Sequence, residues 1–264
     1  MKIERSLTAA IALALALGLG LAGCTTQAPA EPAGQTESGG DDRTVETGTA
    51  LTKDDFAERI TAAQLQAGMV HVSQTIETDG ATTTTDGAMT VTADIGSARV
   101  AMTSSGPTGS NEVRIVDGVM YMNLGELSQN MFMVIDGSDS ALMDPTEIMR
   151  LLDPQTQIDT FGRSILELTP GEREEIDGVS TTRYTLVLDT AILLSASPIP
   201  GIDPAVVGET VDYEIWVGDD DLPRRMSMSF AGTASSTTAV TDYSRWGEPV
   251  DIQAPSADQI IALG

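Results

Sequence analysis

The hydrophobic pattern divides the chain into three parts. Residues 7–21 form an unbroken run of small and apolar residues behind a short basic start. In residues 25–50 the only sizeable apolar side chain is Val45, among Pro, Gly, Ser, Thr and acidic residues, and such a segment cannot bury enough surface to order itself. The remainder has the periodicities of helices and strands. We therefore expect a signal peptide at 1–23, a disordered linker at 24–50 and a single folded domain at 51–264.

The folded part opens with a helical pattern and continues with strands. Apolar residues recur at helical spacing from Phe56 to Ala67, with Thr52 as the expected N-cap and Gly68 as the stop. After Gly68 the period changes to 2: apolar and polar residues alternate from Met89 to Ile95 in GAMTVTADI, and again in ARVAM and EVRI.

Turn signals separate these strands. Asp117–Gly118 and Asp177–Gly178 each stand between two β-prone runs, which is a strong hairpin signal. A further turn is expected at Gly218–Leu222, and the last strand ends at Gly247. The pattern predicts an α+β fold built on a long antiparallel meander of about 9–11 strands, which must curl or close at that size.

Two inserts interrupt the strands and have helical features. In the first insert, 141–165, Asp144 is the expected N-cap and Pro145 the first helical residue. The second insert, 189–208, starts with an apolar half-turn, and a last helix is expected within 256–263. We predict that these helices cover the apolar face of the curved sheet.

Methionine is common where such a sheet and its cover would meet. All of the 12 methionines except Met1 lie in the folded part, while aromatic residues are 4% of the chain. Flexible methionine suits a surface that accepts apolar partners of varied shape, although a packed, methionine-rich core would have the same pattern. If there is an apolar cavity, alternation selects as its lining Met89, Val91, Val100, Met102, Ile115, Met149, Leu152, Leu186, Met226 and Met228.

The chain has one cysteine, and its neighbours indicate a use for it. Leu21-Ala22-Gly23-Cys24, at the end of the apolar run, resembles the lipobox of bacterial lipoproteins. The resemblance implies that Cys24 receives a diacylglyceryl group and becomes the first mature residue, anchored to the extracytoplasmic face of the cell membrane. The alternative is a plain secreted protein. A single cysteine excludes an internal disulfide.

The net charge and a search for catalytic motifs exclude some classes of function. A formal net charge of −25 excludes nucleic-acid binding, which requires a basic patch. The single histidine, His71, falls on an expected strand as a half-exposed residue, and no nucleophile or metalloprotease motif occurs. We predict no catalytic residue, no metal site and no cofactor. Asp219–Asp221 is expected to be an acidic turn rather than a calcium loop, and Arg224–Arg225 a solvated pair at a strand edge rather than a contact for an anionic lipid head group.

Four segments together resemble one family. DPTEIMRLLDP, IVDGVMYM, EREEIDGVSTTRYTL and YSRWGEPVDIQAP are similar to corresponding segments of the mycobacterial LprG/LppX lipoproteins. The resemblance covers nearly the whole folded part. It implies a half-barrel sheet with helices on its concave side, as in the LolA and LolB carriers, enclosing a cavity for acyl chains. This chain departs from the family in being unusually acidic and rich in methionine.

The resemblance also implies partners. We expect a monomer that binds a lipid or glycolipid and carries or presents it in the cell envelope, with the membrane reached through Cys24 and the lipid supplied by a membrane exporter. The alternative is a surface lipoprotein that docks another protein and holds no lipid. A carrier needs an internal apolar cavity, whereas a docking module needs an exposed apolar patch and a filled core.

Overall fold

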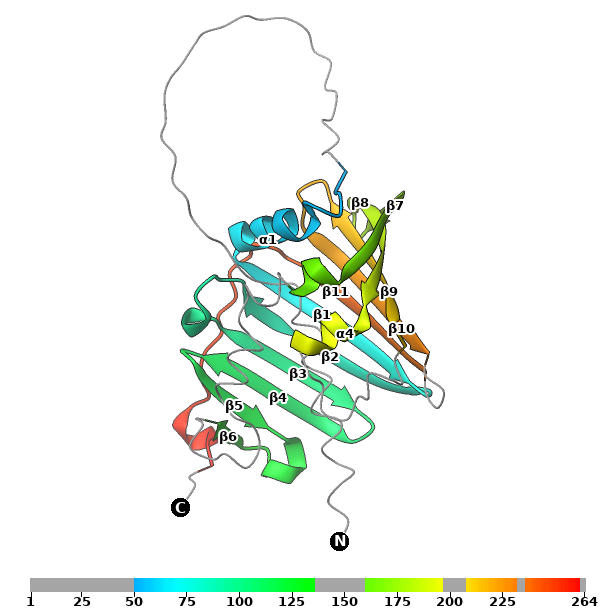
Figure 1. The fold of residues 1–264 in the computed structure, drawn as a ribbon. Coiled ribbons are helices and arrows are strands. Elements are labelled where there is room, and N and C mark those ends of the chain that lie inside the picture. The colour runs from blue at the N-terminus through cyan, green and yellow to red at the C-terminus, as the bar shows by residue number, and fades with distance from the viewer. Residues whose placement is uncertain (1–49, 136–159, 197–207, 232–235, 262–264) are drawn as a thin grey trace, which may run out of the picture.

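The computed structural model describes residues 50–135, 160–196, 208–231 and 236–261 (Figure 1). The expected signal peptide, Cys24, most of the linker and the insert that begins at Asp144 lie outside these ranges. Helices in the described ranges are α1 (Phe56–Ala67), α4 (Thr190–Ala196) and the helical residues 160–164, with short 3-10 turns η2 (Ile95–Ser97), η3 (Gly125–Ser128) and η4 (Ala257–Gln259). The strands are β1 (Met69–Thr78), β2 (Ala81–Thr90), β3 (Val100–Gly106), β4 (Gly109–Val116), β5 (Val119–Asn123), β6 (Phe132–Ile135), β7 (Ile165–Ile176), β8 (Val179–Asp189), β9 (Thr210–Gly218), β10 (Pro223–Ala231) and β11 (Ser236–Ser244).

Within the described ranges the strands form one antiparallel sheet of 11, in the order β6-β5-β4-β3-β2-β1-β11-β10-β9-β8-β7. Two meanders, β1 to β6 and β7 to β11, therefore join where β1 pairs with β11, from His71 opposite Ser244 to Thr78 opposite Thr237. Strands β6 and β7 form the two edges, so the sheet curves without closing (Figure 1). This confirms the predicted curved antiparallel sheet.

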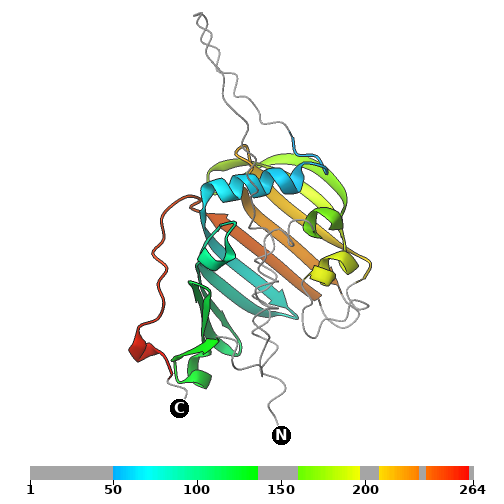
Figure 2. The same cartoon turned by 60° about the vertical axis from the view of Figure 1, so that its left-hand side comes forward.

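The helices lie on one face of the sheet. Figure 2 shows α1 and α4 on the concave side, with α1 crossing the strands near one end. Phe56 and Ile60 of α1 and Leu193 of α4 pack into the same hydrophobic cluster as the strands. A sheet with one apolar face needs such a cover, and the predicted placement of helices there is confirmed for these two.

Within the described residues, Asp-Gly pairs make tight turns at three places. Asp117–Gly118 and Asp177–Gly178, both predicted, have positive φ at both residues, 52° and 76° in the first and 50° and 80° in the second. That backbone requires residues that tolerate the left-handed region, as Asp and Gly do. Asp79–Gly80 joins β1 to β2 in the same way, with 51° and 81°, and the sequence analysis missed it. Asp86–Gly87, by contrast, lies inside β2.

Two predicted helix ends were wrong. Helix α1 begins at Phe56 with Asp55 as its N-cap, one turn later than the expected N-cap Thr52. The Asp55 carboxylate accepts a hydrogen bond from the Thr52 backbone N–H at 2.7 Å, which holds residues 52–55 in a turn. At the other end of the domain, η4 is a single turn, because Ile260 leaves it to pair with Phe132.

Strand β2 ends at Thr90, so the predicted alternation from Met89 to Ile95 holds only as far as Val91, which is still buried in the cluster, whereas Ala93 is exposed. Asp94 then makes a turn: its carboxylate accepts the Gly96 N–H at 3.1 Å, and its carbonyl accepts the Ser97 N–H at 3.0 Å. Short polar side chains of this kind compete with strand pairing by bonding the nearby backbone.

The C-terminal segment, residues 245–261 after β11, covers the other face of the sheet. Ala88, Val116 and Ile252 form a second buried cluster there, and Arg99 Nη1 donates to the Ile252 carbonyl at 3.3 Å. Further along, the Ile261 N–H donates to the Phe132 carbonyl at 2.8 Å. The segment therefore protects the β6 edge, which would otherwise present unpaired backbone groups.

Candidate functional site

One hydrophobic cluster extends over most of the concave face. Its buried strand residues come from β1 to β4 and from β7 to β11. Neighbouring strands lie about 4.8 Å apart, so nine adjacent strands span roughly 40 Å. We call this surface the apolar face.

Strand register explains how the face is assembled. Val70 on β1 is opposite Met89 on β2, Met89 is opposite Val100 on β3, and Val100 is opposite Ile115 on β4. Directly opposite residues of an antiparallel pair project to the same side. The four side chains, all buried, therefore form a continuous apolar row across half of the sheet.

The structure brings most of the predicted cavity residues together. Met149 and Leu152 lie outside the described residues, and Met228 is partly buried against the cluster. The other seven are buried members of one cluster: Met89, Val91, Val100, Met102, Ile115, Leu186 and Met226. Their common face is now established, while their contact with a ligand stays a prediction.

Aromatic residues form part of the face that sequence reasoning missed. Phe56 of α1 lies 6.3 Å from Phe161 and 6.2 Å from Tyr184 between ring centroids. Phe161 in turn lies 5.8 Å from Tyr213. The alternation in VDYEIWVG, which places Tyr213 and Ile215 on one side, would have identified the β9 contribution.

A thioether lies between two tyrosines within the cluster. The hydroxyl groups of Tyr213 and Tyr243 donate to Met226 Sδ at 2.8 and 3.1 Å. Burial raises the pKa of both phenols, well above the ordinary range for Tyr213. Both tyrosines therefore stay neutral at physiological pH, and this part of the face has no charge.

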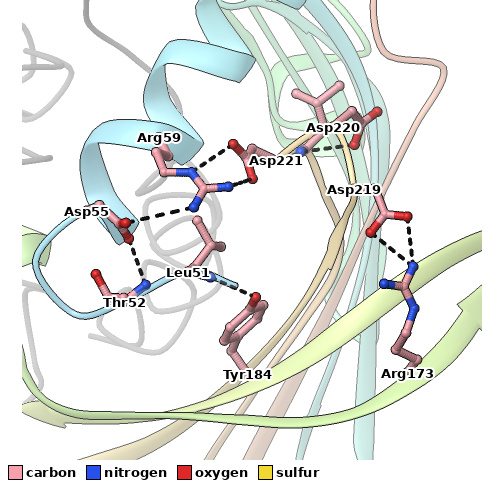
Figure 3. Close-up of polar contacts among 10 residues, drawn as sticks. Leu51, Thr52, Asp55, Arg59, Arg173, Tyr184, Asp219, Asp220 and Asp221 are labelled. Carbon is pink, nitrogen blue, oxygen red and sulfur yellow. Dashed lines mark hydrogen bonds and ion pairs between the residues drawn. The ribbon is translucent and has the colours of Figure 1, made fainter. Parts of the chain in front are cut away.

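The three consecutive aspartates at the β9–β10 turn each pair with an arginine, and Figure 3 shows the pairs of Asp219 and Asp221. Asp219 pairs with Arg173 of β7 at 2.7 Å, Asp220 with Arg224 at 2.6 Å, and Asp221 with Arg59 of α1 at 2.7 Å. This confirms the predicted acidic turn. The described residues contain no group of three or more His, Cys, Asp or Glu side chains that could hold a metal ion.

Arg224 and Arg225 differ from their predicted setting. They lie on β10, which is between β9 and β11 and is not an edge strand. Arg225 Nε donates to Asp242 Oδ1 at 2.6 Å, and Arg224 binds Asp220 in the turn. His71 is a half-buried residue of β1, as expected.

Large exposed apolar residues are few in the described ranges. Leu127 is 75% exposed and Leu166 is 43% exposed. Leu127 is in η3, beside the β6 end of the sheet, whereas Leu166 is on β7 at the opposite edge. The two do not form a common patch. No helix in the part of the chain that the structure describes has the length and apolarity to cross a membrane.

A family of unknown function, DUF7537, matches residues 9–246 of the chain. The chain belongs to this family. No curated protein matches the sequence of this DUF7537 member.

Solved structures with a similar fold are known. LprF from Mycobacterium bovis superimposes with a TM-score of 0.53 at 18% identity, over 77% of this chain and 96% of LprF. The lipoprotein LppX of Mycobacterium tuberculosis gives 0.50 at 16% identity, over 76% of this chain and 100% of LppX. At these identities the likeness shows the fold alone, and the predicted LprG/LppX-like fold is confirmed at that level for this DUF7537 member.

Proposed function

We propose that this DUF7537 protein is a cell-envelope lipoprotein that binds the acyl chains of a lipid or lipoglycan on its apolar face and carries or presents them. The observation that supports this is the apolar face itself. It is neutral and extends roughly 40 Å, which exceeds the length of a common fatty acyl chain. Met89, Met102 and Met226 give it adaptable side chains.

The proposed role is binding rather than catalysis. The face contains thioether, aliphatic and neutral phenol groups, and acid–base chemistry needs a group that titrates near the working pH. The alternative role in docking a protein receives less support, because Leu127 and Leu166, the large exposed apolar residues of the described ranges, lie far apart.

The anchor and domain division belong to the same proposal. Residues 1–23 would direct export, Cys24 would carry the lipid anchor, and residues 25–50 would tether a monomeric domain from residue 51 onward. With no nucleotide-binding motif in the sequence, the bound lipid would be delivered by a membrane exporter.

The first experiment asks whether the domain holds a lipid. Native mass spectrometry after gentle purification should find a co-purifying lipid, and the delipidated domain should take up a fluorescent fatty acid. A domain that neither retains nor takes up lipid would contradict the proposal, and would leave protein docking as the better explanation.

A variant pair then tests the face. Met102→Trp adds a large ring to the apolar face and should lower uptake at least tenfold, because overfilled packing excludes the ligand. The matched control is Thr103→Trp, the next residue of β3, which is exposed on the opposite face. Circular dichroism should show that both variants fold. Equal uptake by the two variants would mean that the ligand binds elsewhere.

A further inference from the structure

A row of buried polar side chains crosses the apolar face. Ser104, Thr85, Gln74 and Thr241 lie opposite one another on β3, β2, β1 and β11. They are 7%, 7%, 3% and 3% exposed. Gln74 follows the core residue Val72 by two positions, so it projects to the same side. We call these four residues the polar row.

The polar row satisfies itself only in part. Thr85 Oγ1 and Ser104 Oγ share a hydrogen bond of 2.7 Å, and Gln74 Nε2 donates to Thr241 Oγ1 at 3.0 Å. Gln74 Oε1 is buried, and no donor reaches it from the residues that the structure describes. A buried carbonyl oxygen without a donor is destabilising. The row therefore has an open acceptor site.

The surroundings of the open acceptor are apolar along the strands. On β1 the row lies between Val72 and Ile76. Met102 of β3 is one register step away on the Val72 side, and Ile76 lies between Ala239 of β11 and Thr83 of β2. Across β11 the row meets Met226, whose sulfur already accepts two phenol hydroxyls. An alkyl chain lying along β1 would thus cross the polar row between Val72 and Ile76.

We propose that the polar row binds a hydroxyl group of the lipid, which donates its proton to Gln74 Oε1; this rests on the proposed lipid-binding function. No charged side chain belongs to the row, so a neutral donor suits it. The Thr241 hydroxyl, whose oxygen accepts the Gln74 amide, can donate its own proton to the ligand oxygen. An ether or a plain alkyl chain has no proton for Gln74. The ligand class is therefore a lipid with a free hydroxyl on or beside its alkyl chain.

The test compares hexadecanol with its methyl ether, in which a methyl group replaces the hydroxyl proton. Each displaces a fluorescent fatty acid from the delipidated domain. The wild type should prefer the alcohol, and Gln74→Leu should reduce the ratio of the two affinities by about tenfold, since an unpaired buried acceptor discriminates to that degree. The affinity ratio of the two probes is compared between wild type and variant. Their difference in hydrophobicity is the same for both proteins and therefore cancels. Gln74→Met, which keeps the chain length, should behave in the same way if Leu packs poorly.

Gln64→Leu is the matched control. Gln64 is also buried, at 1% exposure, with an unpartnered Oε1, but it lies on α1 rather than on the polar row. It should leave the probe ratio at the wild-type value. A wild-type ratio in both Gln74 variants, or an equal loss in Gln64→Leu, would overturn the inference. If neither probe bound the wild type, the proposed function would fail; if both bound it equally, this inference alone would fail.

Discussion

At Gly87 the backbones of β2 and β3 approach so closely that a side chain has no room. A Cβ placed there would lie 2.0 Å from the Ala101 carbonyl oxygen and 2.7 Å from Met102 Sδ. The Met102 side chain thus fills the space that glycine leaves on the apolar face. Glycine within a strand often marks such an approach.

We expect Gly87→Ala to destabilise the domain by about 1–3 kcal/mol, because the contact with the Ala101 carbonyl involves backbone and can be relieved only by moving β3. Urea unfolding measures the change. Gly96→Ala is the control: its Cβ would meet only the Asp94 carboxylate, at 3.3 Å, and it should shift stability by less than about 0.5 kcal/mol. Similar unfolding midpoints for the two variants would show that β3 moves at little cost.

At the level of single residues, sequence reasoning found several aliphatic residues and methionines of the face and missed the aromatic and the polar ones. Period-2 alternation identifies Met89, Met102 and Ile115, because hydrophobic side chains that repeat every second position must share a side. By the same rule Gln74 shares the side of Val70 and Val72, but its polar side chain does not mark it as a member of an apolar face. Thr85 ends a run of four threonines that has no alternation at all, so only the register with Gln74 and Ser104 reveals its burial.

Among the elements, α1 is fixed to the sheet by a charged contact as well as by packing. Arg59 Nε and Nη2 donate to the two carboxylate oxygens of Asp221 at 3.0 and 2.7 Å (Figure 3). Both side chains are 27% exposed. The hydrogen bond to Asp221 raises the pKa of Arg59. The contact joins the N-terminal helix to the β9–β10 turn.

Asp221→Asn should lower the stability of the domain by about 1 kcal/mol, since it removes the negative charge from the bidentate, partly buried ion pair with Arg59. Asparagine tolerates the positive φ of 58° at this position, so the turn is kept. Hydrogen exchange should be faster in α1 than in the wild type. Asp219→Asn breaks the more exposed pair with Arg173, 41% and 42% exposed, and should have a smaller effect. Unchanged exchange in α1 would mean that packing alone holds the helix.

How well elements could be predicted depended on whether the signal was local. Hairpins at Asp117–Gly118 and Asp177–Gly178 follow from turn residues that act within four positions. The start of α1 was displaced by one turn, because Thr52 and Asp55 can each cap a helix. The pairing of β1 with β11 has no local signal, since it joins positions such as Gln74 and Thr241 that are 167 residues apart.

For the whole molecule, the proposed tether would set where the domain works. Leu51 is 3% exposed, and its N–H donates to the Tyr184 hydroxyl at 3.1 Å, so the folded domain is fixed from this residue onward. If residues 25–50 form the proposed flexible linker, their root-mean-square reach would be roughly 28 Å. A net charge of −25 would repel the domain from an anionic membrane surface. The location therefore depends on the proposed anchor at Cys24.

Cys24→Ser in the full chain should move the protein from the membrane fraction to the soluble extracytoplasmic fraction, because the site of acylation is lost. Cell fractionation and mass spectrometry of the N-terminal peptide measure this. Thr25→Ser, the neighbouring control, should stay with the membrane and keep the lipid adduct. An unmodified Cys24 in the wild type, with the protein already soluble, would contradict the anchor.

The central pairing of β1 with β11 also bears on how the protein matures. A chain that ends before Ser236 would lack the strand that joins the two meanders, leaving β1 and β10 as free edges in the middle of the fold. Contacts between such distant positions form slowly, because a long loop must close first. The apolar face can thus be completed only when almost the entire chain is available, so the proposed lipid uptake would have to follow the proposed export of the whole chain.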